Sequence, residues 1–549
     1  MTAFDYALLF SLPFFGVGYF ALNVWIMYKL NLWWTSLLDR CRRLIPYLEW
    51  ELYRRFPNLK IERFNARDRD VERDRLMNET TRLPPDEELF VYAMWGTEVF
   101  GPSEIDAFYK NLRRLEWDEG GKFRNEEHAA AKGIAEQRMY GASGAFNLGL
   151  VVRKDEKRFL GMDYFAPLPP EVDYLLVELQ QVSPSFTCVT IGFVLKEEES
   201  KLYAEALSRE RRSERRAVPK SRAVTHLRVD SLKRESIEKA REHYRSIVTS
   251  WFAEFMPGYF STAGGGPSLP TGEFVSTHRS KILADRSTSK PLQGGDWTAL
   301  LTPRRFYRDA WTSGEYAALR AAFDSFEGNS RYHTLFELTA EDLDDESLKY
   351  RGERGRGAYV GIVHEQITGI LSYYAIYALL VEAAKAVRVS RESLEVGRRG
   401  GASKGVLESI RQAFRIFSGL TSAIDDLVEY ASEQSHYDHY AEDFTKKGTG
   451  KYSEQTYHLK DSLRQRTLQL GQRLAKDEAA ARELFDQLAS IVSIQESIRS
   501  QRRMEILTYI AIFLALASLL VAMPTLDKWA EFLQSFTAHV HRLANEHRW

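Results

Sequence analysis

The sequence predicts an α+β membrane protein: a small sheet-containing cytoplasmic domain, a helical domain, a long stalk helix and two transmembrane helices, one at each end of the chain. Uncharged apolar stretches at 6–28 and 506–523 have about the length that a bilayer requires. Segments rich in Val, Ile and Phe between 87 and 200 predict strands, and a long proline-free run before the second apolar stretch predicts the stalk. A chain of 549 residues has room for several domains of this kind.

The composition and the motifs exclude several classes of function. The chain carries 75 basic and 76 acidic residues, so its charge gives no electrostatic support for nucleic-acid binding. Its two cysteines, Cys41 and Cys188, cannot form a disulfide framework or a paired-cysteine zinc site. No His-Glu-x-x-His or phosphate-loop motif occurs, since GRRGGASKG has Ser403 where that loop requires glycine. We therefore predict no enzyme activity, no cofactor and no metal, and interpret the pair His436 and His439 as a surface cluster.

The first element is predicted to be a signal anchor at 6–28, after an outside tail at 1–5. The 23 residues YALLFSLPFFGVGYFALNVWIMY carry no charge, and a cleaved signal peptide would need the positive start that MTAFD lacks. A buried core helix is the alternative, because proline, asparagine and aromatic residues are tolerated in soluble cores. Aromatic residues, leucine and arginine then recur at helical spacing, which predicts an interfacial amphipathic region at 29–82.

An α/β domain with a small sheet is predicted at 83–227. ELFVYAMW, FNLGLVV, DYLLVELQQ and FTCVTIGFVL have the composition of strands, and the last two, separated by VSPS, are expected to pair as neighbours. GPSEIDAFYKNLRRL predicts a helix that Ser103 caps. The basic stretch at 208–222 is interpreted as a solvated helix end and loop, because glutamates interleave with its arginines; contact with anionic lipid or RNA is the alternative.

A mainly helical domain is predicted at 228–450. Its last part is expected to be an antiparallel pair of helices at 359–395 and 404–443 around a glycine turn. The uncharged run QITGILSYYAIYALLV at 366–381 is the third candidate for a membrane span. Positive charge on both of its sides gives it no preferred orientation, so a helix buried within the cytoplasmic domain is favoured.

A long stalk helix is predicted at 451–505 and continues into the second membrane helix at 506–523. Leucine, isoleucine and alanine recur at three-, four- and seven-residue steps from Leu463 to Ile498, which is typical of an amphipathic or coiled-coil stripe. A helix of about 70 residues would be roughly 100 Å long. Such a helix needs partners along its apolar stripe.

The charges that flank the two spans predict the topology. Arg499, Arg502 and Arg503 precede the second span, and positive residues also follow the first. By the positive-inside rule, the chain lies in the plasma (inner) membrane with its bulk in the cytoplasm and both termini outside. Residues 524–549 are predicted to form an amphipathic tail on the outer side, because DKWAEFLQSFTAHVHRLANEHRW is too polar to span.

The stalk and the second membrane helix resemble a known family. MEILTYIAIFLALASLLVAM is similar to the first membrane helix of CorA-type divalent-cation transporters, and the shared features are Met504 at the entrance, Leu507-Thr508, Ile510-Ala511, Phe513-Leu514 and the closing Met523. The order of a sheet-containing domain, helices, stalk and membrane is also similar. The resemblance implies a funnel-shaped pentamer whose first membrane helix lines the pore. The chain departs from that family in having Ala522, Met523 and Pro524 in place of Gly-Met-Asn, and a tail too polar to be the family's second membrane helix.

The candidate site residues are small or hydroxylated side chains that share one line of the second span: Thr508, Ala511, Ala515, Ser518 and Ala522. One hypothesis is close packing against another membrane helix, with Gly16 and Gly18 of the first span as the partner. The other is a narrow pore lined by threonine and serine in an oligomer. Such a pore would have no strong cation filter, because the span contains no acidic residue.

The leading functional hypothesis is an oligomeric inner-membrane protein whose cytoplasmic domain senses a signal and controls a membrane pore. Such a protein would be a CorA-like channel or a membrane-permeabilising effector of a bacterial defence system. The expected partners are membrane lipid, further copies of the chain, and a cytoplasmic protein or small molecule as the signal. The alternative is a membrane-tethered scaffold whose spans only anchor a cytoplasmic binding module. An enzyme with dispersed catalytic residues is a third hypothesis.

Overall fold

The structure describes the chain from residue 68 onward, with gaps, and only residues 25 and 29 before it. The computed structural model describes residues 25, 29, 68–118, 130–141, 143–155, 164–217, 224–262, 268–283, 296–302, 310–324, 332–349, 354–400, 420–448, 452, 454–522 and 526–546. The predicted first membrane helix at 6–28, apart from Trp25, and the interfacial region up to residue 67, apart from Lys29, lie outside the described residues, as does Gly401 of the predicted glycine turn.

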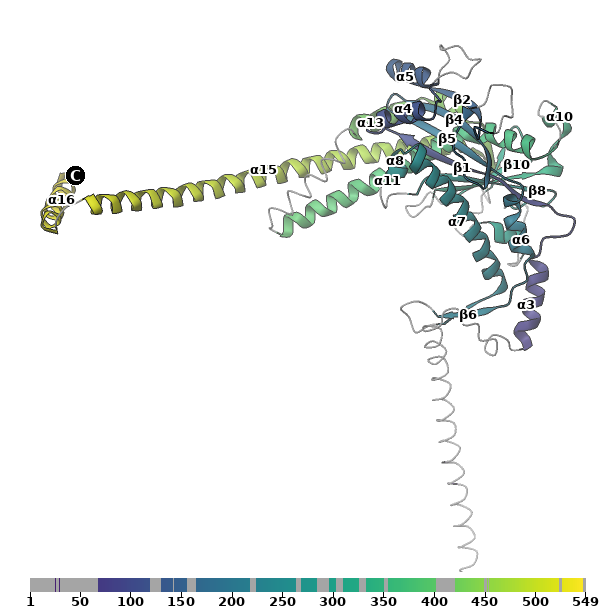
Figure 1. Cartoon of the computed structure of the whole chain (residues 1–549), viewed down its shortest axis with the longest axis horizontal. Helices are drawn as coiled ribbons and strands as arrows, with labels where there is room; N and C mark the ends of the chain where they lie inside the picture. The colour runs from purple at the N-terminus through teal and green to yellow at the C-terminus, as the bar shows by residue number, and fades with distance from the viewer. Residues whose placement is uncertain are drawn as a thin grey trace, which may run out of the picture. The chain divides into compact units, whose positions relative to one another are not determined.

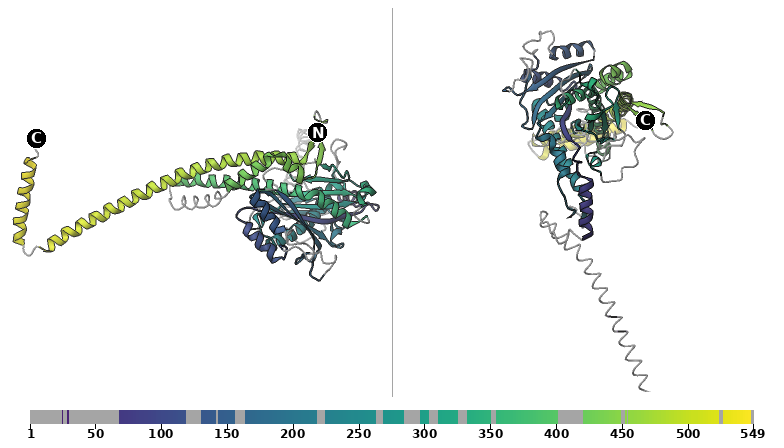
Figure 2. Two further views of the ribbon diagram at one scale, coloured as in Figure 1. Left: turned by 90° about the horizontal axis from the view of Figure 1, so that it is seen from above. Right: turned by 90° about the vertical axis from the view of Figure 1, so that its right-hand side faces the viewer.

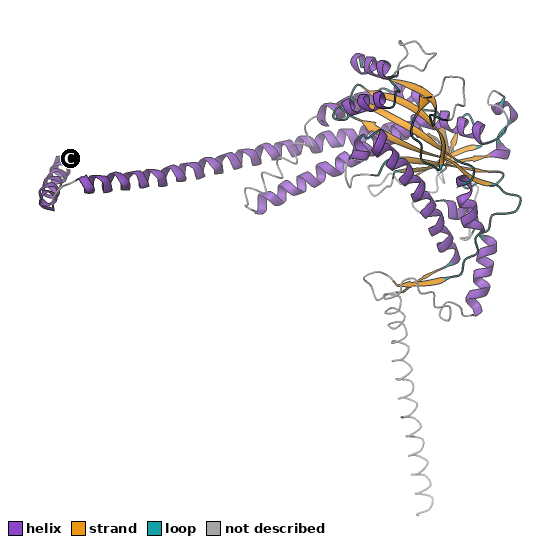
Figure 3. Ribbon diagram, viewed as in Figure 1, coloured by secondary structure: helices purple, strands orange, loops and turns teal. Residues whose placement is uncertain are grey.

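Within the described residues, eleven strands form one mixed sheet (Figure 3). Their order is β13 (Thr456–His458), β12 (Phe444–Lys447), β9 (Trp311–Ser313), β10 (Leu319–Phe323), β11 (His333–Thr339), β8 (Thr271–Thr277), β1 (Leu89–Phe100), β5 (Phe186–Leu195), β4 (Val172–Ser183), β2 (Gly144–Val152) and β3 (Tyr164–Phe165). Neighbours are antiparallel except for the pairs β8–β11 and β2–β3, which are parallel. A separate hairpin joins β6 (Glu214–Ala217) to β7 (Val224–Leu227).

The centre of the sheet is formed by strands whose side chains are buried on both faces. All ten residues of β5 are buried, and they are mainly valine, isoleucine, phenylalanine and threonine, which pack well on a pleated surface. β4 and β5 pair antiparallel, with Ser183 opposite Phe186 at the turn. The predicted pairing of DYLLVELQQ with FTCVTIGFVL is therefore confirmed.

Helix α7 (Val229–Phe255) covers one face of the sheet (Figure 1). Its buried residues recur every three or four positions, as expected of a helix with one face on a core. The approach to β1 is close: a Cβ added at Gly96 would lie 2.5 Å from Val248 and 2.8 Å from Phe252. Shorter helices complete this part of the chain: α3 (Asp68–Thr80), α4 (Ile105–Arg114), α5 (Ala130–Tyr140), α6 (Leu202–Ser208), α8 (Tyr259–Thr262), α9 (Trp297–Leu301) and α10 (Asp345–Leu348).

The first part of helix α11 (Arg356–Gly400) covers the opposite face. Thr190 on β5 lies 3.3 Å from the hydroxyl of Ser372, and Trp95 Nε1 on β1 donates to His364 Nδ1 at 3.2 Å. Among the described residues, one helical stretch, Arg356–Val389, meets the length and hydropathy criteria for a membrane span, but 83% of its most apolar window is buried in the protein. The expectation that 366–381 is buried within the protein is confirmed.

The C-terminal part of the described chain is helical except for the β12–β13 hairpin. Helices α13 (Leu420–Ser432) and α14 (Gln434–Tyr440) are separated by Glu433, whose backbone is extended. The second helix of the pair predicted at 404–443 is thus broken, and residues 401–419 lie outside the described range. The predicted long helix is present as α15 (Leu459–Ala522), which has 64 residues, roughly 95 Å in length, and is followed by α16 (Leu526–Glu546) (Figure 2). It begins at Leu459 and not at residue 451, because residues 456–458 form β13.

Three predictions differ from the structure. The α+β class is confirmed, but the sheet is large rather than small. The described part of 228–450 is mainly helical, but it also contributes five strands to the sheet, β8 to β12, because short segments such as TGEFVST gain a place in a sheet only from their neighbours. Ser103 does not cap α4, since Glu104 occupies the N-cap position and makes no capping hydrogen bond with its side chain.

The chain divides into two compact units. The first, Met1–Leu379 with Glu429–Thr467, includes the α+β domain that contains the sheet. The second, Leu380–Val428 with Leu468–Trp549, contains the later parts of α11 and α15 and all of α16.

Candidate functional site

The last turns of α15, residues 506–522, form an apolar helix, and the side chains of residues 506–519 are almost all exposed. Tyr509 and Phe513 are each 71% exposed, and Leu507 is 61% exposed. From residue 506 to residue 519, every residue is exposed except Ala517, which is half-buried. Burying a leucine, isoleucine or phenylalanine stabilises a structure by about 1.5–3 kcal/mol each. Leaving this segment in water therefore forfeits on the order of 10 kcal/mol.

All five candidate site residues lie on α15. Thr508, Ala511, Ala515 and Ser518 are exposed, and the side chain of Ala522 is outside the described set. The hydroxyl of Thr508 donates to the carbonyl of Met504 at 2.8 Å, which satisfies its donor within the helix itself. The helix confirms that the first four share one side of α15. Their predicted partners Gly16 and Gly18 lie outside the described residues.

The basic residues before the apolar segment point away from this line. Successive residues of an α-helix are rotated by about 100°, so Arg499 and Arg502 fall on the side opposite to the line through Thr508 and Ala515. Both arginines are exposed. The small residues and these two arginines therefore face different surroundings on opposite sides of α15.

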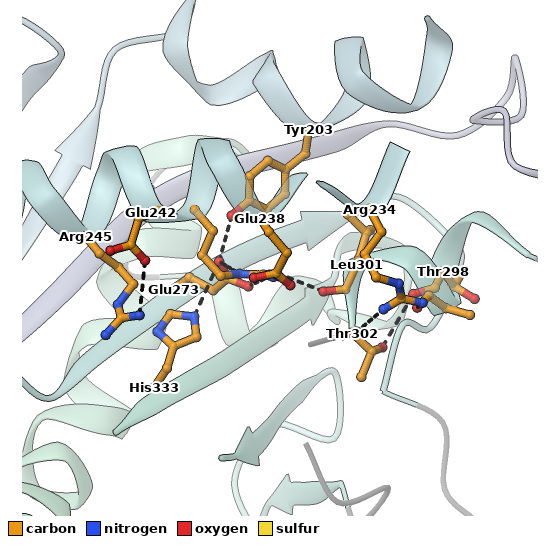
Figure 4. Close-up of polar contacts among 12 residues, drawn as sticks. Tyr203, Arg234, Glu238, Glu242, Arg245, Glu273, Thr298, Leu301, Thr302 and His333 are labelled. Atoms are coloured by element: carbon orange, nitrogen blue, oxygen red, sulfur yellow. Dashed lines mark hydrogen bonds and ion pairs between the residues drawn. The ribbon is translucent and has the colours of Figure 1, made fainter. Parts of the chain in front are cut away.

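A cluster of charged side chains is buried between α7 and the sheet (Figure 4). Arg241 on α7 makes a bidentate pair with Glu273 on β8, with Nε–Oε2 and Nη2–Oε1 distances of 2.8 and 2.6 Å. The hydroxyl of Tyr203 donates to Glu273 Oε2 at 2.8 Å, and Nε2 of His333 lies 3.6 Å from the same oxygen. Arg241 also donates to the carbonyl of Leu301 at 2.8 Å. One guanidinium thus connects α7, β8 and the end of α9.

The electrostatics of this cluster favour an ion pair. Burial by itself raises the pKa of Glu273, but Arg241 and His333 outweigh it, and the pKa of the carboxyl is well below its ordinary value. Burial lowers the pKa of His333, so the imidazole is neutral at pH 7. The side chains of Arg241, Glu273 and His333 are 4%, 0% and 5% exposed, which leaves no route for a substrate. We interpret the cluster as structural.

Two further carboxylates, which the sequence did not single out, hold a short helix and a loop from inside the sheet. Glu98 on β1 accepts the backbone N–H groups of Phe260 and Ser261 at 2.8 and 2.9 Å. Glu337 on β11 accepts those of Ile282 and Leu283. Burial raises the pKa of both carboxyls to about 7. Glu98 and Glu337 could have been recognised in the sequence as acidic residues inside otherwise apolar strands, GTEVF and TLFEL.

The histidine pair predicted to be a surface cluster shows no metal-binding arrangement. His436 stacks on Tyr430 with ring centroids 4.5 Å apart, and its Nε2 lies 3.3 Å from Glu433. Among the residues that the structure describes, no group of three or more His, Cys, Asp or Glu could hold a metal ion.

The basic stretch at 208–222 includes strand β6. There Arg216 pairs with Glu214 and, at 2.7 Å, with Glu235 on α7, so this arginine is neutralised within the domain.

An open groove of about 440 Å³ lies along α7 near its C-terminal end. Its lining is mostly apolar and includes Pro167, Leu168, Trp251 and Phe255, with Glu254 as a charged residue. The indole N–H of Trp251 donates to the carbonyl of Pro167 at 2.8 Å, which links two parts of the lining. The groove can accept an apolar side chain or a small ligand.

In comparisons of sequence, no protein-family model and no curated protein matches this chain.

Proposed function

We propose that the chain is an oligomeric membrane protein, and that its α+β domain lies in the cytoplasm, receives a signal and controls a pore formed by the apolar end of α15. The observation that carries the proposal is the exposure of residues 506–519 around the whole circumference of the helix. A soluble helix hides one apolar face, whereas a helix that is apolar all round requires either lipid or protein on every side. In an oligomer within a bilayer, lipid covers the outer side of such a helix and other copies of the chain cover the remaining sides.

Length and charge support a membrane environment. Residues 506–522 rise by about 25 Å, close to the thickness of the hydrocarbon layer. The exposed arginines at 502 and 503 precede this segment and suit the cytoplasmic face of the membrane. The α+β domain, which comes before them in the chain, would then lie on the cytoplasmic side.

The line of small residues supports a pore in an oligomer. Thr508 and Ser518 bring hydroxyl groups to the same side of α15 as Ala511 and Ala515, and a ring of such helices would have a narrow, weakly polar lumen. The similarity to the stalk and first membrane helix of CorA-type transporters fits this arrangement. A membrane-permeabilising defence effector would use the same geometry.

A tethered scaffold is the second candidate, and the groove beside Trp251 favours it. An open, largely apolar groove of about 440 Å³ is suited to binding part of a partner protein. In that case the small residues of α15 only pack against another membrane helix. Replacing both spans by unrelated hydrophobic helices would then preserve activity.

The first test is the mass of the full-length protein in detergent, measured by multi-angle light scattering with correction for bound detergent. A ring of defined stoichiometry supports the pore, and a monomer contradicts it.

The second test is ion flux from liposomes that contain the reconstituted protein. The double variant Thr508→Leu/Ser518→Leu should reduce flux roughly tenfold or more, because it fills the proposed lumen. Leu516→Phe, which adds bulk on the other side of the helix, is the matched control and should conduct normally. Equal flux from the double variant and the wild type would refute the pore.

A further inference from the structure

Helix α16 has one apolar face and one polar face. Over residues 528–542, with a rotation of about 100° per residue, an arc of roughly 160° contains only apolar, alanine or threonine side chains: Trp529, Ala530, Phe532, Leu533, Phe536, Thr537 and Val540. The other arc carries the charged and amide side chains of this stretch, namely Lys528, Glu531, Gln534 and Arg542.

The apolar face of α16 is uncovered within the described part of the chain. Phe532, Leu533, Phe536 and Val540 are 42%, 54%, 55% and 48% exposed. The rings of Phe532 and Phe536 stack on each other with centroids 6.2 Å apart, so they form one continuous surface. Side chains of this size gain about 1.5–3 kcal/mol each from complete burial, so an uncovered face of this kind needs a partner.

The connection to α15 places this face beside the membrane. Only residues 523–525 separate the end of α15 at Ala522 from the start of α16 at Leu526. A chain of that length spans at most about 14 Å. If the end of α15 leaves the hydrocarbon layer, α16 begins at the headgroup level, where tryptophan and phenylalanine on one face are favoured.

We propose that α16 is an interfacial helix whose apolar face lies on the phospholipid surface where α15 leaves the membrane. The inference deepens the proposed function and rests on it, because it requires the apolar end of α15 to span the bilayer. A second copy of the chain is the other occupant to consider. The width of the apolar arc argues against it, since a helix that pairs through a seam uses a narrower stripe. The polar face carries both signs of charge, so binding does not depend on anionic lipid.

The experiment uses the full-length chain with single cysteines labelled by an environment-sensitive NBD fluorophore. Cys41 is replaced by serine, and Cys188 is buried and stays unlabelled. The probe position is Phe536→Cys on the apolar face, and Gln534→Cys on the polar face is its matched control. A third label at Leu514→Cys reports on the membrane segment itself. Each protein is reconstituted in dioleoylphosphatidylcholine vesicles with and without lipids that carry a spin label on the acyl chain.

The expected result is a blue-shifted emission for the label at 536 and quenching by the spin-labelled lipid that exceeds the quenching at 534 by roughly twofold or more. Equal, water-like emission at both positions would overturn the proposal. So would a label at 536 that is shielded from water but not quenched by lipid, together with disulfide cross-linking between chains at the same position; that outcome identifies a second copy as the partner. Absence of quenching at 514 would instead refute the membrane span, and with it the proposed function.

Discussion

Replacing Glu273 by glutamine tests whether the buried ion pair holds helix α7 on the sheet. The substitution keeps the size of the side chain and removes its charge. It leaves the Arg241 guanidinium, which is 4% exposed, without the carboxylate that it contacts at 2.6 and 2.8 Å. Glu238, the other carboxylate near Arg241, is 39% exposed and approaches only Nη1. It cannot replace Glu273 on the buried side.

Removing one partner of a buried ion pair typically costs about 3–5 kcal/mol, because the remaining charge is stranded away from water. Unfolding entropy near 2 cal/mol/K per residue, over roughly 300 ordered residues, converts this cost into a fall in Tm of about 5–8 °C. Glu238→Gln removes an ion pair of the same arginine at a partly exposed position. It should cost less than about 1 kcal/mol, or under about 2 °C.

The assay is thermal unfolding of the full-length protein in detergent, followed by tryptophan fluorescence, at pH 7 and at lower pH. The pKa of Glu273 is depressed in the folded state, so its stabilising contribution is complete above the unfolded value near 4.5 and is lost as the pH falls below it. The gap between wild type and Glu273→Gln should therefore narrow below about pH 4.5. The double variant Glu273→Gln/Arg241→Met should recover part of the loss, because no stranded charge remains. If Glu273→Gln lowers the Tm no more than Glu238→Gln does, the ion pair is not what fixes α7.

Three further predictions concern the α+β domain. Gly369→Ala should cost about 1–3 kcal/mol, since its Cβ would lie 1.8 Å from the carbonyl of Tyr440, whereas Gly357→Ala, with nothing within 4 Å, should be neutral in the same melting assay. Burial raises the pKa of Glu98 to about 7, so folding stability should fall as the pH rises from about 4.5 to 7, and Glu98→Gln should flatten that dependence. Cys188 is buried with a raised pKa, so its thiol should react with Ellman's reagent only after unfolding.

Clear outcomes would contradict these expectations. A normal Tm for Gly369→Ala would mean that α11 and α14 can separate without cost. An unchanged pH profile for Glu98→Gln would mean that another group titrates in this range. Rapid reaction of Cys188 in the folded protein would mean that α11 opens readily from the sheet.

Strands with a strong local composition could be predicted from the sequence, and strands defined by their neighbours could not. β4 and β5 are rich in valine, leucine and isoleucine, so their pairing follows from the sequence. β8, with the sequence TGEFVST, looks like part of a loop because Gly272 and Glu273 are poor strand residues. It is a strand because β1 and β11 lie on its two sides. Such a partnership depends on residues far away in the chain.

For the candidate site, the sequence predicts which residues share one side of the helix but not what that side contacts. A period of three and four residues places Thr508, Ala511, Ala515 and Ser518 on one side of a helix, and α15 has this geometry. Whether that side faces a lumen or another helix depends on other copies of the chain, so the pore stays a proposal. The bidentate pair of Arg241 and Glu273 could not be predicted, because no sequence pattern links α7 to β8 at this register.

The position of the β12–β13 hairpin has a consequence for biosynthesis. β12 pairs with β9 across a long stretch of intervening chain, and β13, the outermost strand, ends at His458 of 549 residues. The ribosome must therefore make most of the chain before the sheet can close, and the apolar end of α15 emerges soon afterwards. Completion of the sheet and, under the proposed function, insertion of α15 into the membrane then fall in the same interval. Any delay in either leaves an open strand edge and a bare apolar helix on one nascent protein, the two surfaces from which aggregation most readily begins.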